Sequence, residues 1–197
     1  MTIDYIDAQA ASPFWAQAKK ATVDALDLQH GTIALDVGSG TGEETRHMAA
    51  AAGSAIGVDT NSALVEEAIR RTGPEYDARF EQATADALPF PDATFAGVRV
   101  ERTLQNADDL GAAIAEIWRV AAPGARIIVL EPDWDTLVFD AGPLAATRTV
   151  TRAFADALPN PVAGRQVARR LRKLGALDVR VEPLTAALTD YGAAEEQ

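Results

Sequence analysis

Three glycines, Gly38, Gly40 and Gly42, alternate with other residues directly after an apolar run at residues 33–37. Glycine allows positive φ and lets a ligand approach the backbone closely. The following residues 43–52 predict a helix, whose first N–H groups have no partner within the helix and are free to bind a ligand. A strand, a glycine turn and a helix in this order indicate a nucleotide-binding loop. A tight turn without a ligand is the alternative.

Acidic residues surround this loop and bear on which nucleotide it would bind. The dinucleotide fingerprint G-x-G-x-x-G places its third glycine at position 43, where this chain has Glu43. Glu44 follows, and Asp36 precedes the loop. A pyrophosphate would meet three carboxylates here, whereas a ligand with a sulfonium and an ammonium group would meet favourable charge. Spacing and charge therefore both favour S-adenosylmethionine (SAM) over NAD.

A further acid, Asp59, ends the predicted strand at residues 55–58. An acid at this place can accept hydrogen bonds from both ribose hydroxyls of a nucleotide. The alternative is an acidic cap for the helix predicted over residues 62–71. Together with the glycine loop, the position favours the ribose role.

The elements that must position these residues alternate between strands and helices. The sequence predicts strands over residues 33–37, 55–58, 79–83, 95–100 and 126–130, and helices over residues 12–28, 43–52, 62–71, 144–157 and 165–174. A further helix is predicted to begin after a cap at Asp108 or Asp109 and to end at Pro123-Gly124. Such alternation is typical of β-α-β units and a parallel sheet. Residues 179–181 and 184–188 predict an antiparallel pair. The expected fold is an α/β, Rossmann-like three-layer sandwich with a mostly parallel central sheet and an antiparallel closing strand.

The length and composition indicate one domain over residues 1–197. Its only separable part is the N-terminal helix, within about residues 1–28, which is a candidate lid carrying Tyr5, Phe14 and Trp15. The chain has no cysteine and two histidines, which excludes disulfides, thiolate nucleophiles and a His-rich metal site, and no metal is expected.

The charge and the apolar runs also limit the partners. A net charge of -11 repels a phosphate backbone, so nucleic acid is not an expected partner. No apolar run reaches the roughly 18 residues that a bilayer requires. The N-terminal residues lack the basic start of a signal peptide. We therefore expect a cytoplasmic protein without a membrane partner.

Five blocks of the sequence resemble, in order, the motifs of class I SAM-dependent methyltransferases. The resemblance is closest to the type 11, ubiquinone/menaquinone methyltransferase-like group. The blocks are LDVGSGTG at 35–42, GVDTN at 57–61, TADALPF at 84–90, FAGVRV at 95–100, and IWRV at 117–120 with the proline, glycine and strand at 123–131.

The resemblance implies a role for individual residues of this chain. The methionine part of SAM would lie against the glycine loop and the end of the fourth strand, at Asp36, Gly38, Ser39, Gly40, Gly42 and Glu101. The ribose would bind Asp59 and Thr60, and the adenine would bind Asp86 and Ala87. Residues 99–102 would face the methionine end and the substrate.

The implied reaction is transfer of a methyl group from SAM to a small-molecule acceptor, with S-adenosylhomocysteine (SAH) as product. The acceptor atom, oxygen, nitrogen or carbon, stays open, and no catalytic residue is assigned. A general base is needed only when the acceptor must lose a proton. The candidates follow strands four and five: Glu101, Glu131, Asp133 and Asp135. Trp134 is a candidate for lining the acceptor site, with a structural role as the alternative.

Two departures from the family keep other functions open. Leu104-Gln105-Asn106 stands where relatives often carry a histidine, so a histidine base is not transferred to this chain. Relatives also usually run tens of residues beyond the position of Gln197. Either the chain is shortened, or residues 184–188 close the sheet differently. A non-catalytic SAM-fold binding module is therefore one alternative. An NAD-dependent oxidoreductase is another, which Glu43 disfavours.

Overall fold

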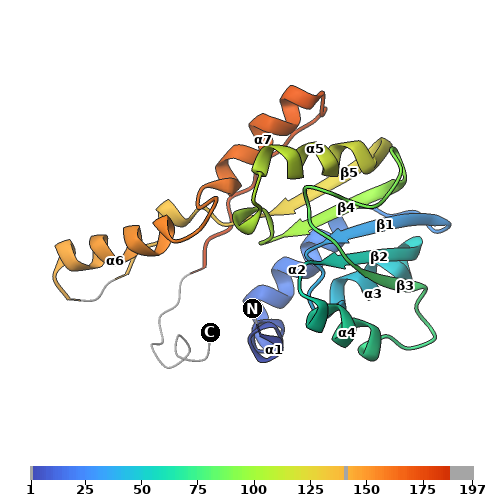
Figure 1. Cartoon of the computed structure of the whole chain (residues 1–197), viewed down its shortest axis with the longest axis horizontal. Helices are drawn as coiled ribbons and strands as arrows, with labels where there is room; N and C mark the ends of the chain where they lie inside the picture. The colour runs from blue at the N-terminus through green and yellow to red at the C-terminus, as the bar shows by residue number, and fades with distance from the viewer. Residues whose placement is uncertain (1, 140–141, 187–197) are drawn as a thin grey trace.

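A five-stranded sheet forms the centre of the molecule in the computed structural model, which describes residues 2–139 and 142–186 (Figure 1). The strand order is β3-β2-β1-β4-β5, and every pairing among them is parallel. The strands are β1 Thr32–Val37, β2 Gly53–Asp59, β3 Ala78–Gln82, β4 Phe95–Glu101 and β5 Ala121–Leu130. The strand order reverses between β1 and β4. In open parallel sheets, ligands bind beyond the carboxyl ends of the strands at such a reversal.

Helices cover both faces of this sheet, as an α/β Rossmann-like fold requires (Figure 1). The helices of the described residues are α1 Ile3–Ala11, α2 Pro13–Ala25, α3 Glu43–Ala52, α4 Ser62–Arg71, α5 Leu110–Val120, α6 Leu144–Asp156 and α7 Ala163–Leu174, with short 3-10 turns at Leu104–Asn106 and Trp134–Thr136. Of these, α6 extends away from the sheet (Figure 1). The predictions of α3 and α4 are confirmed to the residue. None of these helices combines the length and the apolar character needed to cross a bilayer.

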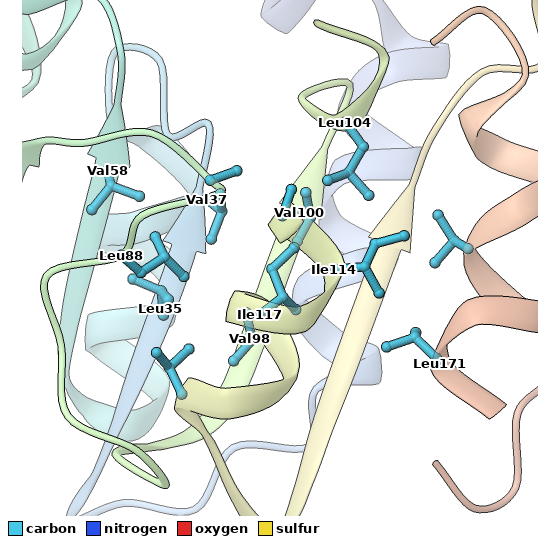
Figure 2. Packing of buried hydrophobic residues seen from close by; sticks show 14 of the residues in the cluster. Leu35, Val37, Val58, Leu88, Val98, Val100, Leu104, Ile114, Ile117 and Leu171 are labelled. Carbon is cyan, nitrogen blue, oxygen red and sulfur yellow. The ribbon is translucent and has the colours of Figure 1, made fainter. Parts of the chain in front are cut away.

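The alternation of side chains along the central strands builds two apolar layers. Leu35 and Val37 of β1 point to one face, where they meet Ile114 and Ile117 of α5, with Leu171 of α7 to the side (Figure 2). Ala34 points to the other face and packs in the cluster that holds residues of α3. Apart from Leu171, these residues are at most 2% exposed. Because successive side chains of a strand face opposite ways, one strand anchors both layers and holds its carboxyl end rigidly.

The N-terminal region forms two helices. The helix predicted over residues 12–28 is α2, which begins at Pro13 as expected but ends at Ala25, and α1 before it was not predicted. Ser12 has an extended conformation, with φ -73° and ψ 124°, and its N–H bonds the carbonyl of Gln9. The residue before a proline is disfavoured in the helical region, so Pro13 ends α1 and begins α2. This break lets α1 leave the axis of α2.

The predicted antiparallel closing strand is not formed by the described residues. Residues 179–186 contain no strand, and residues 187 and 188 lie outside the described part of the chain. Val181 and Leu184 are 67% and 53% exposed, so no layer covers the apolar side of this segment. Pro183 also lacks the N–H that a ladder would need. The alternating pattern of residues 179–186 therefore forms no strand, because no other element of the described chain buries its apolar side chains.

The start of β5 also differs from the prediction. The strand begins at Ala121 rather than at Arg126, directly after α5. Pro123 and Gly124, expected to end the preceding helix, lie within β5, where the pairing with β4 shifts register between Phe95 and Gly97. Proline has no backbone N–H to donate to a neighbouring strand. Pro123 is tolerated here because the ladder with β4 is interrupted at the register shift.

Candidate functional site

The glycine loop joins β1 to α3 at the carboxyl edge of the sheet. Gly38, Gly40 and Gly42 have φ values of 81°, 55° and 79°, in the left-handed region. A Cβ at position 38 would lie 1.8 Å from the hydroxyl of Thr103, and one at position 42 would lie 2.5 Å from the ring of Phe80. Conformation and packing therefore both require glycine here.

Asp59 lies at the end of β2 and bonds the loop directly. One oxygen accepts a hydrogen bond from the Gly40 N–H at 3.0 Å, and the other accepts one from the Asn61 N–H at 2.9 Å. The cap of α4 is Asn61, whose side chain accepts from the Ala63 N–H. Asp59 is therefore not the helix cap that the sequence left open. An ionised carboxylate has about four acceptor positions, so both oxygens can accept further donors.

Asp36, at the same edge, lies underneath the loop. It is fully buried, and its two oxygens lie 3.0 Å from Arg99 Nη1 and 2.8 Å from the hydroxyl of Thr45. Burial raises the pKa of Asp36, and the charge of Arg99 opposes that rise. A direct contact with a ligand, as the sequence predicted for Asp36, does not fit this burial.

Arg99 occupies the middle of β4 and is the largest fully buried side chain. Its guanidinium donates to Asp36, to Glu101 and to the hydroxyl of Thr22 in α2. Burial by itself lowers the pKa of Arg99, but the carboxylates of Asp36, Glu101 and Glu44 raise it above its ordinary value, so it stays charged. The expectation that Arg99 faces a substrate is wrong, because it holds together α2, β1 and β4.

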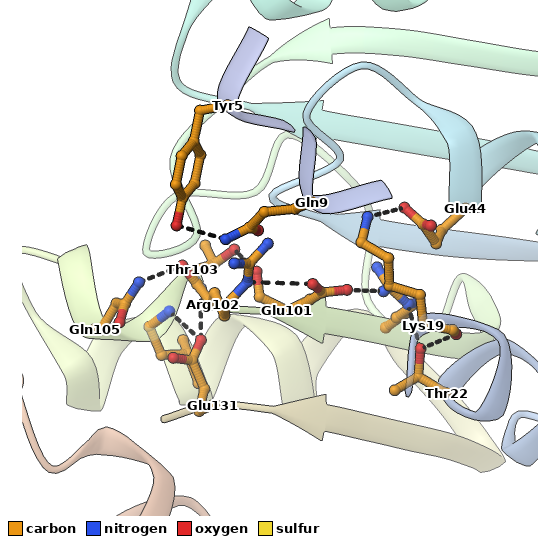
Figure 3. Close-up of polar contacts among 12 residues, drawn as sticks. Tyr5, Gln9, Lys19, Thr22, Glu44, Glu101, Arg102, Thr103, Gln105 and Glu131 are labelled. Atoms are coloured by element: carbon orange, nitrogen blue, oxygen red, sulfur yellow. Dashed lines mark hydrogen bonds and ion pairs between the residues drawn. The ribbon is translucent and has the colours of Figure 1, made fainter. Parts of the chain in front are cut away.

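A second buried ion pair ties the helices above this edge. Lys19 of α2 lies 3.1 Å from Glu44 of α3, and both side chains are less than 10% exposed. Although burial raises the pKa of Glu44, Lys19 and Arg99 together lower it below its ordinary value. Figure 3 shows this pair beside Thr22 and Glu101. Glu44 therefore serves the protein's own packing, unlike the ligand-facing position that its place after the loop suggested.

Unpartnered polar atoms collect around the same edge. Six buried side-chain nitrogen or oxygen atoms of the described residues have no hydrogen-bond partner. Five of them belong to residues of α1, the glycine loop and the ends of β4 and β5: Gln9 Oε1, Ser39 Oγ, Glu101 Oε1, Arg102 Nε and Glu131 Oε2. A buried polar atom without a partner costs about 1–3 kcal/mol. Several unpartnered polar atoms close together indicate a site for a polar ligand, because the ligand would supply the missing hydrogen-bond partners.

Comparison with known proteins identifies this arrangement. Residues 35–129, which run from β1 into β5, match the family model of the methyltransferase domain. This region is therefore similar to a methyltransferase domain. The chain is 34% identical over 119 residues to the ubiquinone/menaquinone biosynthesis C-methyltransferase of Enterobacter sp. (strain 638), which covers 57% of the chain and 47% of that protein.

Two further likenesses cover more of the chain. An uncharacterized 37.1 kDa protein in transposon TN4556 of Streptomyces fradiae is 35% identical over 198 residues, or 98% of this chain and 57% of that protein. A geranyl diphosphate methyltransferase solved in complex with SAM shares the fold, with a TM-score of 0.65 and 20% identity over 80% of this chain and 63% of that one. The chain spans about half the length of the curated relatives it matches.

The other predicted site residues of the methyltransferase domain lie on the β2 side of the loop. Thr60 and Ala87 are exposed, and Asp86 is half-buried. Ala87 forms an isolated bridge with Thr84, which shapes the turn that presents Asp86. These residues follow β2 and β3, whereas Glu101 is the last residue of β4, the neighbour of β1 on the other side, so the predicted residues flank the glycine loop on both sides.

The acids proposed as bases after β5 differ in their surroundings. Asp133 and Asp135 both pair with Arg165 of α7, which gives them a structural partner. Glu131 instead points toward the turn after β4, where one oxygen accepts the N–H groups of Thr103 and Leu104 at 2.6 Å each. Burial raises the pKa of Glu131 to about 7, against the lowering effect of these N–H groups. Its second oxygen, which has no partner, is the natural place for the proton.

Replacing Glu131 by glutamine is expected to remove a pH dependence of stability. Because the folded-state pKa of about 7 lies above the ordinary value of 4.5, the contribution of Glu131 to folding is complete below pH 4.5 and is lost as the pH rises through 7. The free energy of unfolding of the parent should therefore fall relative to that of Glu131→Gln between these values. Urea denaturation of both proteins at pH 5, 6, 7 and 8 measures the difference. Parallel curves over this range would contradict the raised pKa.

Proposed function

We propose that this chain is a SAM-dependent methyltransferase that moves the methyl group of SAM to a small-molecule acceptor and releases SAH. The observation that carries the proposal is the bond between Asp59 and the Gly40 N–H at the reversal of the strand order. This bond places the carboxylate of Asp59, which can accept hydrogen bonds from ribose hydroxyls, directly beside the glycine loop, which can bind the rest of the cofactor. The family of residues 35–129 and the unpartnered polar atoms around the loop support it.

Three groups of residues around the loop are proposed to bind three parts of the cofactor. Gly38, Ser39, Gly40, Gly42 and Glu101 take the methionine part, Asp59 and Thr60 take the ribose, and Asp86 with Ala87 takes the adenine. Asp36 contributes indirectly, since it fixes Arg99 beneath the loop. SAM supplies the electrophilic methyl group on its sulfonium. The protein's contribution is to hold the acceptor atom in line with that group and to exclude competing geometries.

The acceptor is proposed to bind beyond β4 and β5. Trp134 follows β5, and its indole N–H donates to Gln105 at 2.6 Å, so it borders the turn after β4. Arg102 stacks on Trp15, with 4.8 Å from the guanidinium carbon to the ring centroid. Two likenesses with small-molecule names, the ubiquinone/menaquinone C-methyltransferase and the geranyl diphosphate methyltransferase, support a small-molecule acceptor. The net charge of -11 supports it over nucleic acid.

A ligand titration tests the proposed cofactor. The midpoint of thermal unfolding should rise with SAM and with SAH, because a ligand that binds only the folded state stabilises it by about 2.7 kcal/mol at a hundred times its Kd. NADH should give no shift, since Glu43 replaces the third glycine of the dinucleotide loop. Absence of a shift with both SAM and SAH would contradict the proposal, and a shift with NADH alone would favour an oxidoreductase. SAH binding without turnover on a panel of acceptors would favour a binding module.

A further inference from the structure

Helix α1 lies against the glycine loop. The side chain of Ile6 is 9% exposed, and its Cδ1 atom lies 3.3 Å from the place that a Cβ at Gly40 would take. Asp7, the next residue, accepts two hydrogen bonds from Arg71 at the end of α4, at 2.7 and 2.8 Å. The ion pair fixes α1 from the side of β2 and β3. A ligand that binds on the loop must therefore meet this helix.

Gln9 is the polar residue of α1 that is most deeply buried, at 3% exposure. Its amide nitrogen donates to the hydroxyl of Tyr5 at 2.5 Å, whereas its Oε1 has no partner among the described residues. Figure 3 shows the side chain between Tyr5 and two residues at the end of β4, Glu101 in the strand and Arg102 directly after it. A glutamine that served packing alone would be expected to satisfy both ends of its amide.

The unpartnered atoms near Gln9 indicate what kind of group would bind its Oε1. Oε1 of Gln9 and Oε1 of Glu101 are both acceptors, so both lack a donor. Arg102 lies 3.2 Å from the Glu101 oxygen, but without the geometry of a hydrogen bond. An amide oxygen and a carboxylate oxygen together favour a cation with several donors, and a primary ammonium carries three.

We propose that Gln9 is a ligand-binding residue whose Oε1 accepts a hydrogen bond from the α-ammonium group of the cofactor. The inference rests on the proposed function, since it assigns one contact within the SAM site. It makes α1 part of the binding site itself. Tyr5 holds the amide so that its oxygen faces the ligand, and the pair Asp7–Arg71 holds the helix in register with the loop.

Two ligands that differ only at the amino-acid end test this contact. SAH carries the α-ammonium, and 5′-methylthioadenosine lacks the whole amino-acid end. The variant Gln9→Met keeps the bulk of the side chain and removes the acceptor. Calorimetric titration should show SAH bound about tenfold more weakly by this variant, with the affinity for 5′-methylthioadenosine changed less than twofold. The variant Gln9→Glu keeps an acceptor oxygen and should retain SAH binding.

Two controls separate the contact from a general effect of α1. Gln17→Met alters an exposed glutamine of α2 and should leave both affinities unchanged. Asp7→Asn weakens the pair with Arg71 and should change the affinities for both ligands by the same factor. The unliganded Gln9→Met protein should also unfold at the same or a higher temperature than the parent, because it no longer buries an unpaired oxygen.

Several results would overturn the proposal. Equal weakening of SAH and 5′-methylthioadenosine in Gln9→Met would mean that Gln9 only shapes α1. Unchanged binding of both ligands, or an effect on the acceptor KM alone, would remove Gln9 from the cofactor contacts. If the parent protein binds neither SAM nor SAH, the proposed function itself fails, and that result precedes any variant.

Discussion

Replacing Arg99 by methionine is expected to lower the free energy of unfolding by about 3–5 kcal/mol. The substitution leaves Asp36, which is fully buried, without its cation, and it removes one of the two cations beside Glu101, which is 8% exposed. Removing one partner of a buried pair is costly because the remaining charge can neither reach water nor find another counterion. Urea denaturation followed by circular dichroism measures the loss.

An exposed pair provides the matched control for Arg99. Arg126, on the neighbouring strand β5, lies 2.9 Å from Asp27, and both side chains are more than half exposed. Arg126→Met should therefore cost at most about 1 kcal/mol. The double variant Arg99→Met with Asp36→Asn should recover part of the loss, since it removes one of the charges left unpaired. A cost for Arg99→Met no larger than that for Arg126→Met would show that the buried cluster does not hold the fold together.

Asp59→Ala is expected to weaken SAM binding by about 1–3 kcal/mol, or roughly 5- to 150-fold in Kd, through the loss of two ribose hydrogen bonds. The structure adds a second contribution in the same direction, because the Gly40 N–H loses its acceptor and the loop loses a restraint. Titration calorimetry with SAM and SAH measures the affinities. The unfolding temperature of the unliganded variant shows how much of the effect comes from the loop.

Glu81→Ala on β3 is the control for Asp59, since Glu81 is an exposed acid on the strand next to β2. It removes the same charge without touching the loop and should leave the SAM affinity within twofold. An Asp59→Ala protein that binds SAM as tightly as the parent would show that the ribose lies elsewhere. That result would remove the observation that carries the proposed cofactor site, and the proposal would then rest on the similarity of residues 35–129 to a methyltransferase domain.

Features that depend on neighbouring residues were predictable from the sequence. The glycine loop follows from residues 38–42 themselves, because positive φ at three positions is a local property of glycine. Residues next to α3 and α4 in the sequence bound them, since Gly42 and Gly53 flank α3 and Asn61 caps α4. Asp59 was placed correctly at the end of β2 because a strand and its last residue are read from one short segment. The parallel order of the sheet follows from the alternation of strands and helices.

The features that only the tertiary structure decided all join distant parts of the chain. Asp36 and Arg99 are 63 residues apart, and Arg99 reaches Thr22 across 77 residues, so the sequence did not show that these charges neutralise one another beneath the loop. A charged residue between two buried valines of β4 was the one local signal of this cluster, because a charge in an apolar strand needs a partner.

The position of α1 and the absence of the closing strand from the described residues also depend on contacts between distant parts of the chain, which the sequence did not show. Ile6 and Gln9 gained their significance only when α1 was placed on the glycine loop, which depends on the break at Pro13 and on the ion pair of Asp7 with Arg71. The antiparallel strand failed for the converse reason, since an alternating pattern forms a strand only where another layer buries its apolar side. Local conformation is determined by adjacent residues, whereas burial and charge pairing depend on what the rest of the fold brings to each residue.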